Sequence, residues 1–318
     1  MKADVVPTRP GCQRAGMLAP QRRRAGSAII PRVPPVIPVF DAHIHVGPHD
    51  RMNESARRVM LDGRTDLDLL GRVMSSADEL LRAMDAEGIA RAALVNSVAP
   101  DVLGITDMVN PWVARYVDGH RDRLVPVGGI HPRHSRDVVQ DVKKLLDVYR
   151  LGAIKLHPPH MEMAANAYRT DCPPLADVYR LAGAAKRPVL IHTGTSIFPG
   201  ARNVYADPMA CDDVAVDFPG TTLVLCHAGR PLWYETAFFL ARRHPNVLLD
   251  ISGIPPRKLL DVLPRISEIA DKVLWGTDWP SRGVRSMRRN VDDFLSLPLS
   301  DVVRRKILFD NAAALFPV

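Results

Sequence analysis

Side chains that bind metals and carry protons recur in this chain at the ends of short apolar runs. His43 and His45 close one run, His192 closes another, and His227 and Asp278 follow two more. Residues two apart on a strand point to the same side, so His43 and His45 can reach one ion together. Three neutral imidazoles and a carboxylate suit zinc, manganese or iron, with a position left for water. The pattern therefore predicts a metal site that activates water.

The predicted chemistry assigns roles to the metal, Asp278 and His227. A bound ion would lower the pKa of its water toward ~7. Asp278 could take the proton from that water, and His227 could polarise the substrate oxygen or carry protons. Each residue alone has an ordinary explanation, since a lone histidine usually packs in a core and an aspartate after Gly-Thr often caps a helix. Their coincidence at the ends of several strands favours a functional site.

Eight apolar, β-branched runs that alternate with helical stretches must position these residues. The predicted strands are Val39–Val46, Ala90–Asn96, Leu124–Ile130, Ala153–Leu156, Pro188–His192, Thr222–His227, Val247–Ile251 and Lys272–Thr277. Clear amphipathic segments between them are Ala77–Glu87, Ser135–Tyr149, Pro174–Lys186 and Tyr234–His244. Near-continuous apolar strands indicate a sheet covered by helices on its faces. The alternation predicts an α/β fold, a (β/α)8 TIM barrel, whose catalytic groups lie at the carboxyl ends of the strands.

The alternative fold is a doubly wound open sheet. That fold usually places a Gly-rich phosphate loop after the first strand, and His43-Ile-His45-Val-Gly47 is not such a loop. Two segments lie outside the repeat. Residues 47–74 form a long connection that we expect to act as a lid or substrate loop. Residues 301–316 are expected to form a helix that covers the barrel.

The charge of the chain is concentrated at its N-terminus. The net charge is +7, yet residues 1–38 alone hold seven basic residues, one acid and seven prolines, and residues 39–318 are nearly neutral. Such a segment buries too little apolar surface to fold, so we expect residues 1–38 to be a disordered arm and residues 39–318 to be the catalytic domain. The arm lacks the aromatic residues on which bases stack, which argues against a nucleic-acid partner.

Composition also bears on the compartment. Apolar residues make up 47% of the chain and charged residues 24%, as in ordinary globular proteins. The four cysteines form no Cys-x-x-Cys pair, no apolar run approaches the ~20 residues of a membrane span, and no secretory signal is apparent. We therefore expect a cytoplasmic protein without a membrane partner.

The motifs together resemble the amidohydrolase superfamily. They are Phe40-Asp-Ala-His43-Ile-His45, Ala153-Ile-Lys155-Leu-His157-Pro, Pro188-Val-Leu-Ile-His192-Thr-Gly, Leu225-Cys-His227-Ala-Gly and Leu274-Trp-Gly-Thr-Asp278-Trp-Pro. The resemblance covers residues 39–317 and is nearest to amidohydrolase family 2, the branch around aminocarboxymuconate semialdehyde decarboxylase. It implies a metal-dependent enzyme that forms a homodimer.

The resemblance also implies roles for individual residues. One divalent ion, most often Zn²⁺ with Mn²⁺ or Fe²⁺ as alternatives, would be held by the family's metal ligands, which fall on His43, His45, His192 and Asp278. The acid/base histidine falls on His227, and Lys155 would lie near the site as a catalytic charge. In binuclear relatives a carboxylated lysine bridges two metals. If Lys155 is carboxylated, His192 and His227 would bind a second ion.

Residues near these motifs are candidates for substrate contacts. Arginine suits a carboxylate and tryptophan offers an apolar wall, so we expect a small substrate that bears a carboxylate. The main candidates are His157, Arg230, Trp233 and Trp279, and the further ones are His49, His131, His160, Arg202 and Arg282.

Four functions are compatible with these residues to different degrees. The first is hydrolysis of an amide, lactone or ester by metal-activated water, and the alternative is non-oxidative decarboxylation of an aromatic or unsaturated carboxylic acid. Both use the same residues, so the motifs do not separate them. The remaining hypotheses are an inactive barrel, against which the intact ligand set argues, and nucleic-acid binding through the arm.

Overall fold

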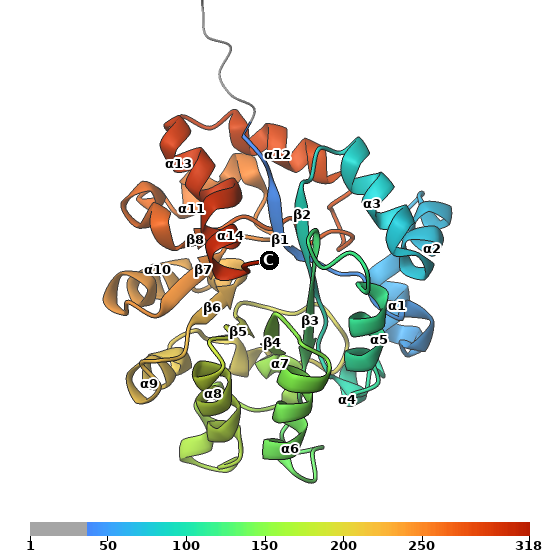
Figure 1. Ribbon diagram of the computed structural model, residues 1–318. Helices are drawn as coiled ribbons and strands as arrows, with labels where there is room; N and C mark the ends of the chain where they lie inside the picture. Colours follow the sequence, from blue (N-terminus) through green and yellow to red (C-terminus); the bar gives the residue numbers. More distant parts are fainter. Residues whose placement is uncertain (1–36) are drawn as a thin grey trace, which may run out of the picture. The chain divides into compact units, whose positions relative to one another are not determined.

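The computed structural model describes residues 37–318, and the arm predicted at residues 1–38 lies almost entirely outside the described residues. Eight parallel strands pair in chain order, and helices surround them (Figure 1). The strands are β1 (Phe40–Ile44), β2 (Arg91–Val95), β3 (Leu124–Gly129), β4 (Ala153–Leu156), β5 (Val189–His192), β6 (Leu223–Cys226), β7 (Val247–Asp250) and β8 (Val273–Leu274). The predicted TIM barrel is confirmed.

Backbone hydrogen bonds join the first strand to the segment that follows the last one. The amide of Ala42 donates to the Trp275 carbonyl at 2.9 Å, and the amide of His45 donates to the Trp279 carbonyl at 2.6 Å. We predicted a last strand through Thr277, but β8 ends at Leu274. The reason is that the Trp275 amide donates to the carbonyl of Ile307, outside the sheet.

The helices between the strands follow the predicted order. They are α1 (Glu54–Leu61), α2 (Leu67–Ser75), α3 (Ala77–Ala86), α4 (Pro100–Leu103), α5 (Val109–Tyr116), α6 (Val138–Lys143), α7 (Pro158–Met161), α8 (Leu175–Ala184), α9 (Ala210–Asp217), α10 (Tyr234–Arg243), α11 (Leu259–Val262), α12 (Met287–Leu295), α13 (Asp301–Arg305) and α14 (Asn311–Leu315). Two π-helical segments, η2 (Lys144–Val148) and η8 (Lys306–Asp310), continue α6 and α13. The helices predicted over 135–149 and 301–316 therefore form with a change of winding in each.

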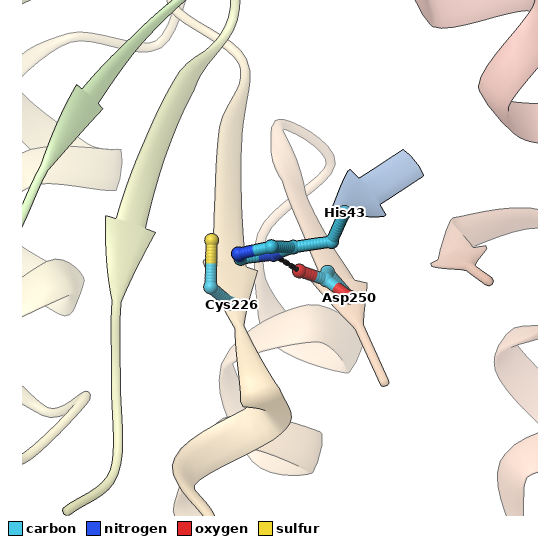
Figure 2. A group of neighbouring side chains, drawn as sticks. All are labelled: His43, Cys226 and Asp250. Carbon is cyan, nitrogen blue, oxygen red and sulfur yellow. Dashed lines mark hydrogen bonds and ion pairs between the residues drawn. The ribbon is translucent and has the colours of Figure 1, made fainter. Parts of the chain in front are cut away.

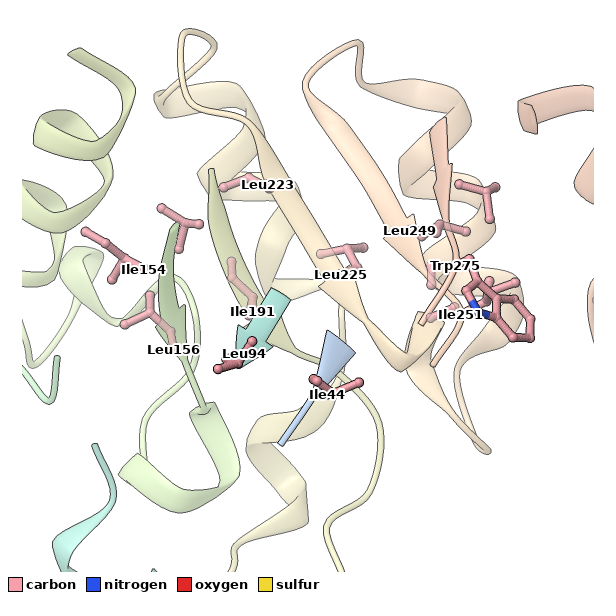
Figure 3. Packing of buried hydrophobic residues seen from close by; sticks show 14 of the residues in the cluster. Ile44, Leu94, Ile154, Leu156, Ile191, Leu223, Leu225, Leu249, Ile251 and Trp275 are labelled. Atoms are coloured by element: carbon pink, nitrogen blue, oxygen red, sulfur yellow. The ribbon is translucent and has the colours of Figure 1, made fainter. Parts of the chain in front are cut away.

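The strands bury apolar side chains on both faces. Ile44, Leu94 and Leu225 belong to the core cluster that packs between the sheet and the helices (Figure 3). A separate cluster includes Phe40 on β1, and the ring of Phe316, just after α14, lies 5.9 Å from the Phe40 ring. Apolar side chains therefore fill the amino-terminal end of the barrel. The polar side chains that point into the barrel lie at the carboxyl ends of the strands, where barrel enzymes hold their active sites.

The long connection over 47–74 is largely helical. The side chain of Asn53 accepts a hydrogen bond from the Ala56 amide at 2.8 Å, which caps the start of α1. Met52 and Ala56 pack with Val98 and Ile105 from the connection after β2. Thus α1 rests on the connection after β2, while Leu70 and Val73 of α2 pack in the main core.

Candidate active site

An extra residue in β1 turns two histidines toward the barrel interior. Asp41 pairs with Ala92, but the next pairing joins Ile44 to Leu94, so β1 carries one residue more than β2 there. Such a bulge shifts the alternation of side chains by one position. As a result, His43 and His45 face inward while Ile44 packs in the outer core.

The buried Asp41 carboxylate holds this bulge against the end of the barrel. It accepts hydrogen bonds from the His43 amide at 3.2 Å, the Thr277 amide at 2.9 Å and the Thr277 hydroxyl at 2.6 Å. Burial raises the pKa of Asp41 to about 7, although these hydrogen bonds act in the opposite direction. Asp41 therefore joins the segment that carries His43 to the residue that precedes Asp278.

Three histidines are oriented by hydrogen bonds at the same ring nitrogen. Nδ1 of His43 donates to the Asp250 carboxylate at 2.5 Å and Nδ1 of His45 to the Val95 carbonyl at 2.8 Å, while Nδ1 of His227 lies 3.1 Å from the Ser252 carbonyl. A carbonyl oxygen only accepts, so the proton lies on Nδ1 in His45, whereas Nδ1 of His227 also lies 3.0 Å from the Ser252 hydroxyl, which can donate to it. Protonation at Nδ1 leaves Nε2 as a lone-pair donor, as in metal-binding histidines.

These lone pairs converge on Asp278. Nε2 of His45 lies 3.0 Å from Oδ1 of Asp278, and Nε2 of His43 lies 3.9 Å from the same oxygen. Ligand atoms of His43, His227 and Asp278 all lie within 4.8 Å of one another. Nε2 of His43 and Oδ1 of Asp278 are buried, and neither has a hydrogen-bond partner within residues 37–318. Because buried polar atoms are rarely left unpaired, this donor set fits a divalent cation.

His192 lies beside this cluster in a different orientation. Its Nε2 faces the Gly194 carbonyl at 3.1 Å, and its ring stacks on His157 at 3.8 Å and lies 4.7 Å from the His227 ring. His227 reaches the cluster through a left-handed turn, with φ of 64°, 46° and 76° at residues 227–229. That conformation costs roughly 1–2 kcal/mol for each residue other than glycine. Of the two histidines, His227 is the one grouped with His43 and Asp278.

Burial sets the protonation states in the cluster. It lowers the pKa of His43 and holds the pKa of His192 and of His227 well below the usual range, so these rings are neutral. Burial alone would raise the pKa of Asp278, but His45, His43 and Arg230 outweigh it and keep that pKa below its ordinary value. The site therefore combines an ionised carboxylate with neutral imidazoles, the states in which both groups bind metals.

A cavity of about 160 Å³ opens over Asp278. An engineered cavity of roughly this size, 150 Å³, holds benzene in another protein, so a small ring fits here. The predicted site residues in its wall are His45, Lys155, His157, His192, His227, Arg230 and Asp278. His49, His160 and Arg282 also line the cavity, together with Met52 and Met60 from the long connection. That connection thus contributes to the cavity wall, as expected of a substrate loop.

Lys155 is one of the cavity-wall residues whose buried polar atoms have no hydrogen-bond partner among the described residues. It is 2% exposed, and its Nζ has no hydrogen-bond partner within the part of the chain that the structure describes. Arg230 is anchored: its Nη1 donates to the Gly253 carbonyl at 2.7 Å and lies 3.9 Å from the Asp278 carboxylate. Both cationic side chains are therefore available to an anionic ligand.

Four of the predicted contacts lie away from the cavity wall. Trp279 is buried and belongs to the outer core, while Trp233 precedes α10. Neither tryptophan lines the cavity, and neither do Arg202 and His131. The geometry gives no support to a substrate role for these four residues.

Sequence reasoning missed Asp250, which is buried at the end of β7 and holds His43 (Figure 2). The available signal was its position, because Asp250 ends an apolar strand as the other site residues do. Cys226 completes a group with His43 and Asp250 within 4.8 Å. Since the Nδ1 proton of His43 is already donated to Asp250, and burial raises the Cys226 pKa to about 12, we interpret this group as support for His43.

The barrel and the ligand set at its carboxyl end define a class, the metal-dependent barrel enzymes. The chain matches the amidohydrolase family (Amidohydro_2) over residues 40–318 and belongs to that family. It is therefore a metal-dependent enzyme of the amidohydrolase type, as predicted. The hypothesis of an inactive barrel is set aside.

Individual relatives resemble this chain either in sequence over a short stretch or in overall fold. A 4-sulfomuconolactone hydrolase of Rhizobium radiobacter is 43% identical over 74 residues, which cover 21% of this chain and 25% of that protein. The match thus spans only about a quarter of that relative's length. Among solved structures, the uncharacterised TIM-barrel protein Bb4693 of Bordetella bronchiseptica has a TM-score of 0.69 at 23% identity, covering 87% of this chain and 97% of that one.

Two decarboxylases share the fold. The 5-carboxyvanillate decarboxylase of Sphingomonas paucimobilis has a TM-score of 0.65 at 16% identity, covering 89% of this chain and 99% of that one. A 5-carboxyvanillate decarboxylase from Novosphingobium aromaticivorans, solved with bound manganese, has a TM-score of 0.62 at 14% identity, covering 88% and 96%. Among residues 37–318, no helix is both long and apolar enough to cross a bilayer.

Proposed function

We propose that this protein hydrolyses a small lactone, a cyclic ester, that bears a carboxylate or a similar anionic group. The observation that carries the proposal is Asp278, whose buried Oδ1 has no hydrogen-bond partner within residues 37–318 and lies at a cavity large enough for a small ring. A carboxylate in that place can act as the general base for water. The partial likeness to a lactone hydrolase supports the lactone over an amide or an open ester.

The metal of the proposed enzyme is one Zn²⁺ ion, with Mn²⁺ or Fe²⁺ as alternatives. His43, His45 and Asp278 supply three ligands, and the fourth is His192, implied by the family motif, or His227, whose ligand atom is grouped with those of His43 and Asp278. An ion in this position supplies a polarised carbonyl and a more acidic water. Lys155 Nζ has no hydrogen-bond partner among the described residues. Carboxylation of this nitrogen would create a binding position for a second metal ion.

The residues of the chain then divide the work of ring opening. The Asp278 carboxylate accepts a proton as the water oxygen bonds to the carbonyl carbon. The ring C–O bond breaks, and Asp278 returns that proton to the ring oxygen. Where His192 is the fourth ligand, Nε2 of His227 is free to form a hydrogen bond with the attacking water, while its Nδ1 faces the carbonyl and hydroxyl of Ser252. Proton transfer by a positioned group of this kind contributes about 10²–10⁴-fold.

Substrate orientation follows from the charges in the cavity wall. Lys155, Arg230 and Arg282 line the cavity, and Arg230 lies 3.9 Å from the Asp278 carboxylate. We propose that they bind the anionic group, because guanidinium and ammonium groups form strong hydrogen bonds to carboxylates. Met52, Ile105 and Phe198 provide the apolar part of the wall that faces the ring.

A panel of carboxylated lactones, amides and aromatic acids tests the reaction. We expect ring opening of a lactone without release of carbon dioxide, with His43→Ala and Asp278→Asn lowering kcat by at least ~10²-fold. His120→Ala is the matched control, because His120 pairs with Asp78 at 3.3 Å away from the cavity and should leave kcat unchanged. Carbon dioxide release from an aromatic or unsaturated acid, without lactone opening, would replace the proposal with the decarboxylase hypothesis.

Metal analysis tests the ligand set separately. His192→Ala and His227→Ala should differ in the amount of metal bound per chain. The variant that loses the active-site ion identifies the fourth ligand. Retention of that ion in His43→Ala would show that the site is misassigned.

We further propose that the protein is a cytoplasmic homodimer that does not bind nucleic acid. Light scattering tests the oligomeric state, cell fractionation tests the compartment, and a DNA-binding assay tests the nucleic-acid interaction.

A further inference from the structure

A second group of ligand-type side chains lies at the rim of the barrel. We propose that Asp101, His131 and His134 bind a divalent transition-metal ion of the Zn²⁺ type. The ligand atoms of these three residues lie within 4.8 Å of one another. Two imidazoles and one carboxylate, with a position left for water, form a ligand set that zinc accepts. We call this group the rim site.

The distances in the rim site are near those that an ion requires. Nε2 of His134 lies 3.0 Å from Oδ2 of Asp101, and the rings of His131 and His134 meet edge to face at 4.3 Å. Two ligands at about 2.1 Å from a tetrahedral Zn²⁺ are themselves roughly 3.4 Å apart. The pair of His134 and Asp101 therefore needs little movement to share an ion.

A second observation points to a ligand. His131 is 4% exposed, and its Nδ1 is buried without a hydrogen-bond partner in the described range 37–318. The hydrogen bond to Asp101 is made by His134, so His131 adds a buried nitrogen that no described residue satisfies. The backbone also supports the arrangement, because the amides of His134 and Ser135 both donate to the His131 carbonyl and close a tight turn between the two rings.

The cation nearest to the rim site along the chain is directed elsewhere. Arg133 lies between the two histidines in sequence, but its guanidinium pairs with Asp171 and donates to the Glu162 carbonyl. Its charge is thus partly compensated by a carboxylate outside the rim site. None of the three rim-site residues lines the cavity over Asp278, so the rim site is separate from the proposed active site.

An ion in the rim site would join two connections that shape the active-site cavity. Asp101 lies on α4, after β2, and His131 and His134 follow β3. Leu103, two residues after Asp101, lines the cavity, and its carbonyl accepts a hydrogen bond from the Asn53 amide at 2.9 Å. The expected role of the ion is therefore to fix this part of the cavity wall, and not to carry out the reaction.

Metal counting on the full chain tests the proposal. Protein is loaded with zinc, passed through a desalting column and measured by elemental analysis, for the unchanged chain, Asp101→Asn, His134→Ala and the control His120→Ala. We expect each rim-site variant to bind one equivalent less than the unchanged chain and the control to lose none. Asp101 and His134 are exposed on the surface, so both variants should fold, which circular dichroism verifies.

A second measurement separates the rim site from the active site. In His43→Ala the active-site ion is lost, and zinc should still raise the unfolding temperature of that variant. Adding His134→Ala to His43→Ala should abolish that rise. Equal zinc content in all four proteins, or loss of zinc in His120→Ala as well, would overturn the rim site without bearing on the proposed lactone hydrolysis.

Discussion

At the scale of single residues, the site depends on groups that never touch substrate. Asp250 accepts the Nδ1 proton of His43 and so directs Nε2 toward Asp278. Ser252 orients His227, whose Nδ1 lies 3.1 Å from the Ser252 carbonyl oxygen and 3.0 Å from the Ser252 hydroxyl. Such partners fix the tautomer and the ring orientation of a metal ligand. The geometry of the site therefore depends on residues that do not line the cavity.

Replacing Asp250 with asparagine tests this role. Asp250→Asn keeps the size of the side chain and removes its charge, so we expect about 10–100-fold weaker metal affinity, as for other partners of metal-binding histidines. Competition with a chromogenic chelator measures the affinity. Asp261→Asn is the control, since Asp261 pairs with Lys258 on the surface at 3.0 Å. Equal affinities in the two variants would argue against the role of Asp250.

At the scale of elements, the site is built where β1 meets the segment after β8. Asp41 bonds to both sides of this junction, to His43 and to Thr277. Gly276 lies at the same junction, and a Cβ atom there would fall 2.7 Å from Cβ of His43 and 2.9 Å from Cβ of Ser252. The absence of a side chain at residue 276 is what allows the two segments to approach.

Gly276→Ala should therefore destabilise the fold and disturb the site together. Overpacking of this kind costs about 1–3 kcal/mol, and displacement of His43 should weaken metal binding. Gly71→Ala is the matched control, because Gly71 lies inside α2 and a Cβ atom there would meet nothing within 4 Å. That change should stabilise the protein by about 0.5–1 kcal/mol. Chemical unfolding of both variants measures the difference, and an unaffected Gly276→Ala protein would refute the close approach.

At the scale of the whole molecule, an ion in the active site would couple binding to stability. It would supply partners to His43 Nε2 and Asp278 Oδ1, which have none among residues 37–318. A ligand that binds only the folded state, at 100 times its Kd, adds about 2.7 kcal/mol to the free energy of unfolding. Removal of metal with a chelator should lower the unfolding temperature, and added zinc should restore it. An unchanged unfolding temperature would contradict metal binding in the folded state.

The N-terminal arm supplies a second prediction at this scale. The family match begins at residue 40, and all eight strands of the barrel lie within residues 37–318. Deleting residues 1–35 should leave both the unfolding temperature and the turnover rate unchanged, because the site and the core draw on residues after that point. Thermal unfolding and steady-state kinetics of the shortened chain measure this. Loss of either property would assign a function to the arm.

The sequence by itself determined the repeating pattern and the chemical type of the site. Apolar runs that alternate with amphipathic helices predict the barrel, because strands buried on both faces need such runs. Histidines and an aspartate at strand ends predict where the chemistry lies, because the carboxyl ends of all eight strands meet at one end of a barrel. His43, His45 and Asp278 could be named on these grounds alone.

Only the tertiary structure decided how these residues face one another. The bulge in β1 turns the shared side of His43 and His45 toward the barrel interior, and the left-handed turn at His227 brings its ring to the cluster. Asp250 became a site residue because its side chain meets that of His43, 207 positions away in the chain. Such contacts arise from strand register and backbone conformation, which depend on packing across the whole barrel and leave no local pattern in the sequence.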